Sequence, residues 1–83
     1  MTAPRFTARP YMWEHNQEVS RTINAARVNV TDEAGQLHDG VGIFSIGRPR
    51  QMLTPEAARR LARDIVNALE SIQLNPNPGH QDH

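Results

Sequence analysis

The sequence contains no cysteine and no lysine, few aromatic residues and no long apolar run. Without cysteine the chain has neither a disulfide bond to stabilise a small fold nor a thiolate ligand for a metal ion. Its apolar runs are far shorter than the roughly 20 residues of a transmembrane helix. Residues 1–10 also lack the apolar centre of a secretory signal peptide. We therefore expect a soluble cytoplasmic protein.

The charges of the chain cancel overall but are unevenly distributed. Nine arginines balance nine aspartates and glutamates, so the formal net charge is zero. This balance argues against a general attraction to nucleic acid or to an anionic membrane. Residues 11–47 are net acidic, whereas 1–10 and 48–72 are net basic. That layout favours contact between the acidic part of one molecule and the basic part of another.

A chain of 83 residues has room for one small domain. The composition predicts an extended arm over 1–10, a single small domain over 11–73 and a disordered tail over 74–83. A chain of this size buries only about 60% of the surface that its unfolded form exposes. Self-association is a common remedy for so small a core, and we expect it here.

Three segments have the character of β-strands. The aromatic residues in 11–15 favour a short strand or strap, and 19–30 alternates between apolar and polar residues. The parity of that alternation changes near Ala25, which predicts either a bulge or a strand covered on both faces. A turn over 32–35 then leads into a return strand over 36–47, in which Gly40 and Gly42 indicate a close approach by another group.

The clearest local prediction is a helix that begins after Thr54. Thr54 is a favourable N-cap, Pro55 suits the first helical position, and Glu56 complements the helix dipole. The apolar positions that follow lie on an arc of about 160°. They are Ala58, Leu61, Ala62, Ile65, Val66, Ala68, Leu69 and Ile72. The Asn and Pro residues at 75–78 predict the end of the helix.

Together these elements predict an α+β fold. We expect a β-hairpin or a short three-stranded antiparallel meander packed on one C-terminal helix, with the Arg48-Pro49-Arg50 segment as the corner between hairpin and helix. A hairpin with one helix is too small for independent stability. We therefore expect a symmetric dimer that forms through the hairpin.

The sequence offers no set of residues typical of catalysis or of a metal site. The four histidines have no helical spacing that would place two of them on one metal ion, and His80, Asp82 and His83 read as surface residues of the tail. His38 and Asp39 are adjacent on a strand, so they face opposite sides of it. Gly40 and Gly42 lead into a strand rather than a helix N-terminus, which argues against a nucleotide loop. We expect no enzyme activity, no cofactor and no bound metal.

Two binding hypotheses remain. Aromatic residues and arginines often anchor protein interfaces, which selects Tyr11, Trp13, Arg48 and Arg50 as partner-binding candidates, although the aromatic residues also fit the core of the homodimer. The alternative is DNA or RNA binding by an arginine cluster, which would contain Arg48, Arg50, Arg59 and Arg63. Acids on the helix argue against the alternative, because Glu56, Arg60 and Asp64 have the spacing of a helical ion-pair ladder.

The stretch from Val28 to Leu69 resembles small ββα proteins of actinobacteria and their phages. The resemblance depends mainly on Leu53-Thr54-Pro55-Glu56 followed by Ala58 and Leu61. It implies a small ββα module, often encoded in an operon or phage accessory region, and brings no activity or catalytic residue with it.

The hypothesis that best fits these observations is a protein-binding or regulatory accessory factor that acts as a homodimer, encoded by a phage or an actinobacterium. Nucleic-acid binding is the alternative, and a structural subunit of a larger assembly such as a virion is a third.

Overall fold

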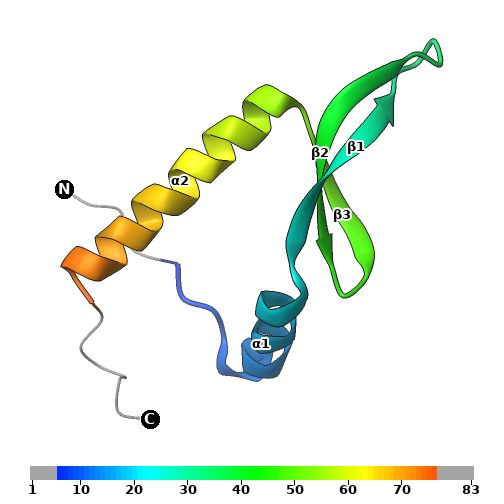
Figure 1. The fold of residues 1–83 in the computed structure, drawn as a ribbon. Helices are drawn as coiled ribbons and strands as arrows, with labels where there is room; N and C mark the ends of the chain where they lie inside the picture. Colours follow the sequence, from blue (N-terminus) through cyan, green and yellow to red (C-terminus); the bar gives the residue numbers. More distant parts are fainter. Residues whose placement is uncertain (1–5, 77–83) are drawn as a thin grey trace.

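The computed structural model describes residues 6–76 of the chain. Its elements follow one another along the sequence as a 3₁₀ turn and helix, three strands and a long helix (Figure 1). Their bounds are η1 Pro10–Met12, α1 Trp13–Thr22, β1 Asn24–Thr31, β2 Leu37–Ser45, β3 Arg48–Leu53 and α2 Pro55–Leu74. The strands form one antiparallel sheet in the order β1-β2-β3. The α+β prediction with a three-stranded meander is confirmed.

The N-terminal part differs from the prediction of a short strand over 11–15. Pro10 occupies the first position of η1, where its fixed φ suits a helical turn. The polar residues that follow Trp13 then continue as α1, whose last turn carries an ion pair between Glu18 and Arg21. Local helix chemistry therefore prevails over the β preference of the aromatic residues.

Strand β1 consequently begins at Asn24, and its pairing with β2 runs without a shift from Asn24 opposite Phe44 to Thr31 opposite Leu37. The change of parity near Ala25 marks the junction of α1 and β1, not a bulge in the first strand. The one irregularity in the sheet lies between Ile43 and Phe44, in the pairing of β2 with β3.

The third strand occupies the segment predicted to be the corner between hairpin and helix. Ile46 and Gly47 have φ values of 52° and 72°, so they form a tight turn that reverses the chain after β2. Arg48, Pro49 and Arg50 therefore belong to β3. Pro49 is tolerated because β3 is an edge strand, where one side of the strand needs no hydrogen-bond donors.

The glycines of β2 lie beneath larger side chains, as predicted. Gly40 is buried, and a Cβ atom there would lie 2.8 Å from Val30 Cγ2. Gly42 is buried as well, and a Cβ atom there would lie 2.9 Å from both Val28 Cγ1 and Phe44 Cε1. The two glycines thus let three apolar side chains lie flat on one face of the sheet.

Helix α2 begins as the sequence predicts. The side chain of Thr54 accepts a hydrogen bond from the backbone N–H of Ala57 at 3.1 Å, and Pro55 is the first helical residue. Ala57 and Ala58 are half-buried, whereas every residue from Arg59 to Pro76 is exposed. The helix therefore contacts the sheet only through its first turn and then extends away from it (Figure 1).

Residues 6–76 lack a closed apolar core. Within residues 6–76 the buried residues are Gly40, Gly42 and Ser45, and none is an apolar side chain. The radius of gyration is 16.5 Å, whereas a compact chain of this length has about 12 Å. Of the helices in this part of the chain, none combines the length and apolarity that crossing a bilayer requires.

Candidate interaction surface

One side of α2 is a continuous apolar surface, which we call the α2 stripe. Its members are Ala58, Leu61, Ala62, Ile65, Val66, Ala68, Leu69 and Ile72. Exposure of the large side chains increases from 39% at Leu61 to 51% at Ile65 and 62% at Ile72. The sequence correctly predicts that these residues share one side of a helix. In one copy of the chain, however, that side faces no packed layer.

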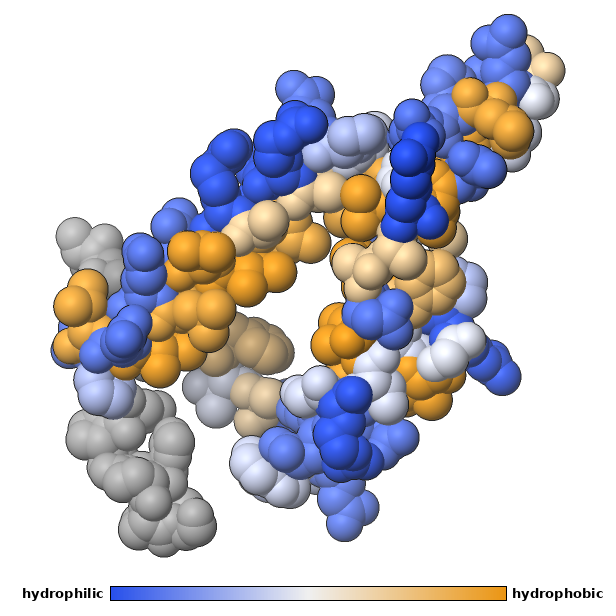
Figure 2. All heavy atoms as spheres, viewed as in Figure 1, coloured by the Kyte–Doolittle hydropathy of each residue, from blue (hydrophilic) through white to orange (hydrophobic). Residues whose placement is uncertain are grey.

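The α2 stripe borders a hollow in the molecule. Figure 2 shows apolar atoms along the side of α2 that faces the sheet and α1, and hydrophilic atoms along its outer side. An opening separates this apolar side of α2 from the rest of the chain in the same view. The helix thus presents its apolar side inward without reaching a partner layer.

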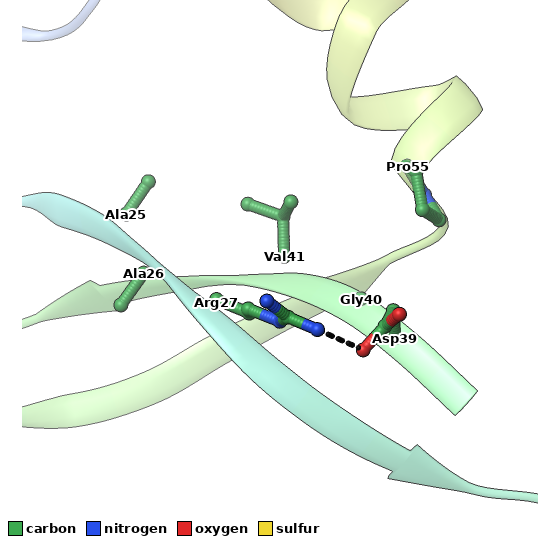
Figure 3. Close-up of a pocket in the computed structure, with 7 residues that line it drawn as sticks. All are labelled: Ala25, Ala26, Arg27, Asp39, Gly40, Val41 and Pro55. Atoms are coloured by element: carbon green, nitrogen blue, oxygen red, sulfur yellow. Dashed lines mark hydrogen bonds and ion pairs between the residues drawn. The ribbon is translucent and has the colours of Figure 1, made fainter. Parts of the chain in front are cut away.

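A depression also lies where α2 leaves the sheet. Figure 3 shows Ala25 and Val41 pointing to the same side of the sheet, toward the level of Pro55 at the start of α2. The lining residues are Ala25, Ala26, Arg27, Asp39, Gly40, Val41 and Pro55. Small side chains and glycine leave this part of the sheet open.

One ion pair borders that depression. Arg27 Nη2 lies 2.9 Å from Asp39 Oδ1 (Figure 3), and both side chains are well exposed. Exposed pairs of this kind contribute about 0–1 kcal/mol, so the pair mainly fixes the position of two polar groups beside apolar ones. The depression is lined by no other charged side chain. Its lining therefore offers one ion pair beside small apolar residues and no set of residues typical of catalysis.

The turn between β1 and β2 holds the other notable titratable pair. Asp32 Oδ1 accepts hydrogen bonds from the backbone N–H groups of Ala34 and Gln36, and Asp32 Oδ2 lies 2.8 Å from His38 Nε2. The hydrogen bond from His38, with those from the backbone N–H groups, lowers the pKa of Asp32. Gly35, at φ 86°, completes the turn. These groups stabilise a turn, and Asp32 and His38 are engaged with each other there.

The predicted partner-binding residues lie on three different elements. Tyr11 in η1 is 77% exposed and Trp13 in α1 is 65% exposed. Arg48 and Arg50 are exposed on the edge strand β3, where Arg50 Nε donates a hydrogen bond to Ser45 Oγ at 3.1 Å. All four side chains are therefore accessible.

The structure does not bring the predicted arginine cluster together. Arg48 lies at the turn that begins β3, whereas Arg59 and Arg63 lie on α2, beyond the other end of that strand. Arg48 and Leu53 are the two ends of this strand, which at its usual rise per residue are about 16 Å apart. The arginines thus occupy two regions of the surface.

The predicted ion-pair ladder on α2 does not form. In residues 6–76 no carboxylate oxygen lies within 4 Å of Arg59, Arg60 or Arg63; the ion pairs there are Glu18–Arg21, Arg27–Asp39 and Asp32–His38. The positions in the predicted ladder, Glu56, Arg60 and Asp64, have the correct spacing but are exposed. Water competes effectively for such groups.

Residues typical of metal sites do not gather in the part of the chain that is described. Across 6–76 no three side chains of His, Cys, Asp or Glu lie close enough together to hold a metal ion. The strand neighbours His38 and Asp39 turn to different partners, as their alternation predicts. His80, Asp82 and His83 lie outside the described residues, as does most of the predicted tail.

Sequence reasoning identified the apolar side of α2 but not its role as a candidate interaction surface. The signal for that role was the width of the apolar arc. A small sheet that contacts only the first turn of a helix leaves the rest of so wide an apolar side uncovered. The strained turn at Ile46 and Gly47 was also missed, although a glycine between an apolar run and an arginine-rich segment indicates a chain reversal.

Comparisons of the chain with protein-family models, with curated protein sequences and with solved structures find no match.

Proposed function

We propose that this chain is a small, non-enzymatic protein-binding factor that acts as a homodimer. The observation that carries the proposal is the exposure of the α2 stripe. Leu61, Ile65 and Leu69 are between 39% and 59% exposed, although they form a continuous apolar side of a long helix. Apolar surfaces of this kind mark protein partners or self-association.

The size of the exposed surface supports association. The accessible area of the chain is 7616 Å², about 2,600 Å² more than a compact monomer of its mass exposes. A standard protein interface removes about 800 Å² from each partner, and obligate dimers remove considerably more. The excess area is larger than a standard interface removes from one partner, which supports association.

The energetics point the same way. Burying one large aliphatic side chain completely contributes about 1.5–3 kcal/mol, and in residues 6–76 no such side chain is buried. The sheet's backbone hydrogen bonds alone do not offset the conformational entropy lost on folding. Folding and association are thus expected to be coupled, since the partner supplies the missing core.

The location of this surface revises the expected dimer. The prediction that the hairpin forms the interface remains untested, but the outer half of the hairpin is rich in polar residues, including Asn29, Asp32 and His38. The apolar excess lies on α2 instead. We therefore assign self-association to α2 and leave Tyr11, Trp13, Arg48 and Arg50 as candidates for contact with another protein.

Sedimentation velocity at micromolar concentration tests the proposal. We expect the wild-type chain to sediment as a dimer and the Leu69→Asp variant to sediment as a monomer or to lose its fold. The matched control is Asn67→Asp, which adds the same charge to the polar side of α2 and should leave the dimer intact. A folded wild-type monomer at this concentration would overturn the homodimer.

Nucleic-acid binding remains the second candidate, because one observation favours it. Arg48, Arg50 and the three arginines of α2 form no ion pair with any acid in residues 6–76. Unpaired guanidinium groups bind phosphate in a bidentate manner. The separation of these arginines over β3 and α2 and the zero net charge weigh against this candidate.

A further inference from the structure

We propose that two copies of the chain associate by packing their α2 helices antiparallel, with the two-fold axis beside Ile65. This inference rests on the proposed homodimer and specifies its interface. The occupant of the exposed α2 stripe is then the α2 stripe of a second copy.

Seven of the eight residues of the α2 stripe are placed symmetrically about Ile65; the exception is Val66, whose counterpart is Asp64. In an antiparallel pair centred there, each of these seven residues lies level with a stripe residue at the same distance on the other side of the centre. The resulting pairs are Ala58 with Ile72, Leu61 with Leu69, Ala62 with Ala68, and Ile65 with its own copy. A small residue faces a large one at the ends, whereas the pairs nearer the middle are matched in size, leucine with leucine and alanine with alanine.

This complementarity depends on the direction of packing. In a parallel pair Ala58 would face Ala58 of the partner and leave a gap, while Ile72 would face Ile72 and crowd the other end. Close packing favours an even distribution of side-chain volume along an interface. The antiparallel pair provides that distribution and the parallel pair does not.

The charges beside the α2 stripe agree with the same arrangement. Arg59 and Glu70 flank the same edge of the stripe, and they lie at nearly equal distances on either side of Ile65. In the antiparallel pair Arg59 of each copy approaches Glu70 of the other, which forms two reciprocal ion pairs. In a parallel pair this edge of one copy lies on the opposite side of the interface from the same edge of the other copy, so Arg59 and Glu70 form no such ion pairs.

The shape of the chain also permits the antiparallel pair. The sheet contacts α2 only at the first turn, and the rest of the helix extends away from it (Figure 1). An antiparallel pair therefore places the two sheets at opposite ends of the helices. The C-terminal half of each α2 then lies beside the partner's sheet, on the side where the hollow seen in Figure 2 opens.

Disulfide trapping tests this geometry directly, because the chain has no natural cysteine. Two Cα atoms must lie within about 7 Å for a disulfide to form, a distance that opposed residues of two packed helices reach. We expect Ile65→Cys to form a covalent dimer under mild oxidation. Asn67→Cys, on the polar side of α2, is the control and should remain uncrosslinked.

A second pair of variants distinguishes the two directions. Ala58→Cys mixed with Ile72→Cys should give a covalent heterodimer, whereas Ala58→Cys alone should give none. Crosslinking of Ala58→Cys with itself would indicate a parallel pair and overturn the inference. Within one helix these two positions are about 21 Å apart, so an intrachain disulfide does not interfere.

Charge exchange provides a readout that does not depend on cysteine chemistry. Arg59→Glu and Glu70→Arg should each weaken the dimer roughly tenfold, since each creates two like-charge contacts. The double variant should regain the wild-type dissociation constant. Arg60→Glu, on the outer side of α2, is the control and should have little effect.

These results separate the interface from the proposed function. A wild-type dimer that neither crosslinks at Ile65 nor responds to charge exchange would overturn the antiparallel α2 pair while the homodimer stands. A wild-type monomer would overturn both.

Discussion

His38 Nε2 lies 2.8 Å from Asp32 Oδ2 across the turn that joins β1 and β2. The same carboxylate accepts two backbone hydrogen bonds through Oδ1. Asp32 therefore connects the backbone of the turn to the first part of β2, and the hydrogen bond from His38 is the largest cause of its lowered pKa.

This arrangement predicts a pH-dependent effect of Asp32→Asn. Because the folded pKa of Asp32 lies below its unfolded value, the carboxylate stabilises the fold at pH values above the unfolded pKa of about 3.9. That stabilisation is lost as the pH falls through the folded pKa. Asparagine keeps the acceptor for the turn but removes the charge. We expect the variant to be less stable than the wild type at pH 6, and the difference to close near pH 2.

Denaturant unfolding at both pH values measures this difference. Glu33→Gln, which neutralises the neighbouring acid of the same turn, is the control and should show no comparable closing of the gap. An Asp32→Asn variant as stable as the wild type at pH 6 would mean that the charge on Asp32 contributes nothing to the turn.

The two glycines of β2 should differ in their tolerance of a methyl group. A Cβ atom at Gly40 would lie 3.0 Å from the carbonyl oxygen of Leu53 as well as near Val30, and a backbone atom in a paired strand cannot move aside. At Gly42 the near atoms are side-chain atoms of Val28 and Phe44. We expect Gly40→Ala to destabilise the protein by about 1–3 kcal/mol and Gly42→Ala by less.

Thermal unfolding of the two variants ranks them. Equal losses of stability would show that backbone and side-chain neighbours yield to the same extent. A larger loss at Gly42 would contradict the argument from the carbonyl oxygen of Leu53.

Ile46 should be a site where a polar residue increases stability. Its φ of 52° places a β-branched residue in the left-handed region, which costs about 1–2 kcal/mol for residues other than glycine. Asparagine tolerates this conformation and, followed by Gly47, forms the preferred two-residue hairpin turn. The backbone N–H of Ile46, which donates to Thr22 Oγ1, is retained. We expect Ile46→Asn to stabilise the fold by about 1 kcal/mol.

Ile46→Ala is the matched comparison, because it removes the same apolar surface but keeps the left-handed conformation unfavourable. The asparagine variant should be the more stable of the two. If Asn and Ala lower stability equally, the side chain of Ile46 contributes a contact that outweighs the strain.

The sequence predicted the parts of this fold that follow from local chemistry. Thr54 and Pro55 define the start of α2, and the alternation after Asn24 with the turn at Asp32 and Gly35 defines the hairpin. Glycine spacing in β2 correctly indicated close packing. These features need no knowledge of distant residues.

The predictions were wrong where the same residues are compatible with two local structures. Tyr11 and Trp13 favour a strand by composition, yet Pro10 at a first helical position and the polar run after Trp13 produce a helix. Pro49 suggested a corner, but the preceding residues, Ile46 and Gly47, turn the chain first. An isoleucine in a left-handed turn contradicts its own propensity, so Gly47 was the signal for this reversal and Ile46 was not.

The candidate site was predictable in composition but not in exposure. Periodicity places Leu61, Ile65 and Leu69 on one side of a helix whether that side packs within the chain or against another copy. Only the path of α2 away from the sheet shows that one chain leaves it open.

A DNA-binding measurement separates the proposed function from its alternative. A protein that neutralises several phosphates binds tightly at low salt and weakens steeply as salt increases. This chain has no net charge, and its unpaired arginines lie on two separate elements. We therefore expect no binding of a 20-base-pair duplex by the wild-type chain at about 50 mM salt, as measured by fluorescence anisotropy.

The Arg48→Gln/Arg50→Gln double variant gives this test its specificity. Its control is Arg27→Gln, which removes a guanidinium group already paired with Asp39. Binding that falls with salt, disappears in the double variant and persists in the control would assign phosphate contacts to β3 and favour nucleic acid as the ligand. Equal binding by all three proteins would indicate nonspecific adsorption. Arg48 and Arg50 would then make no specific phosphate contact, and they would remain candidates for contact with a protein.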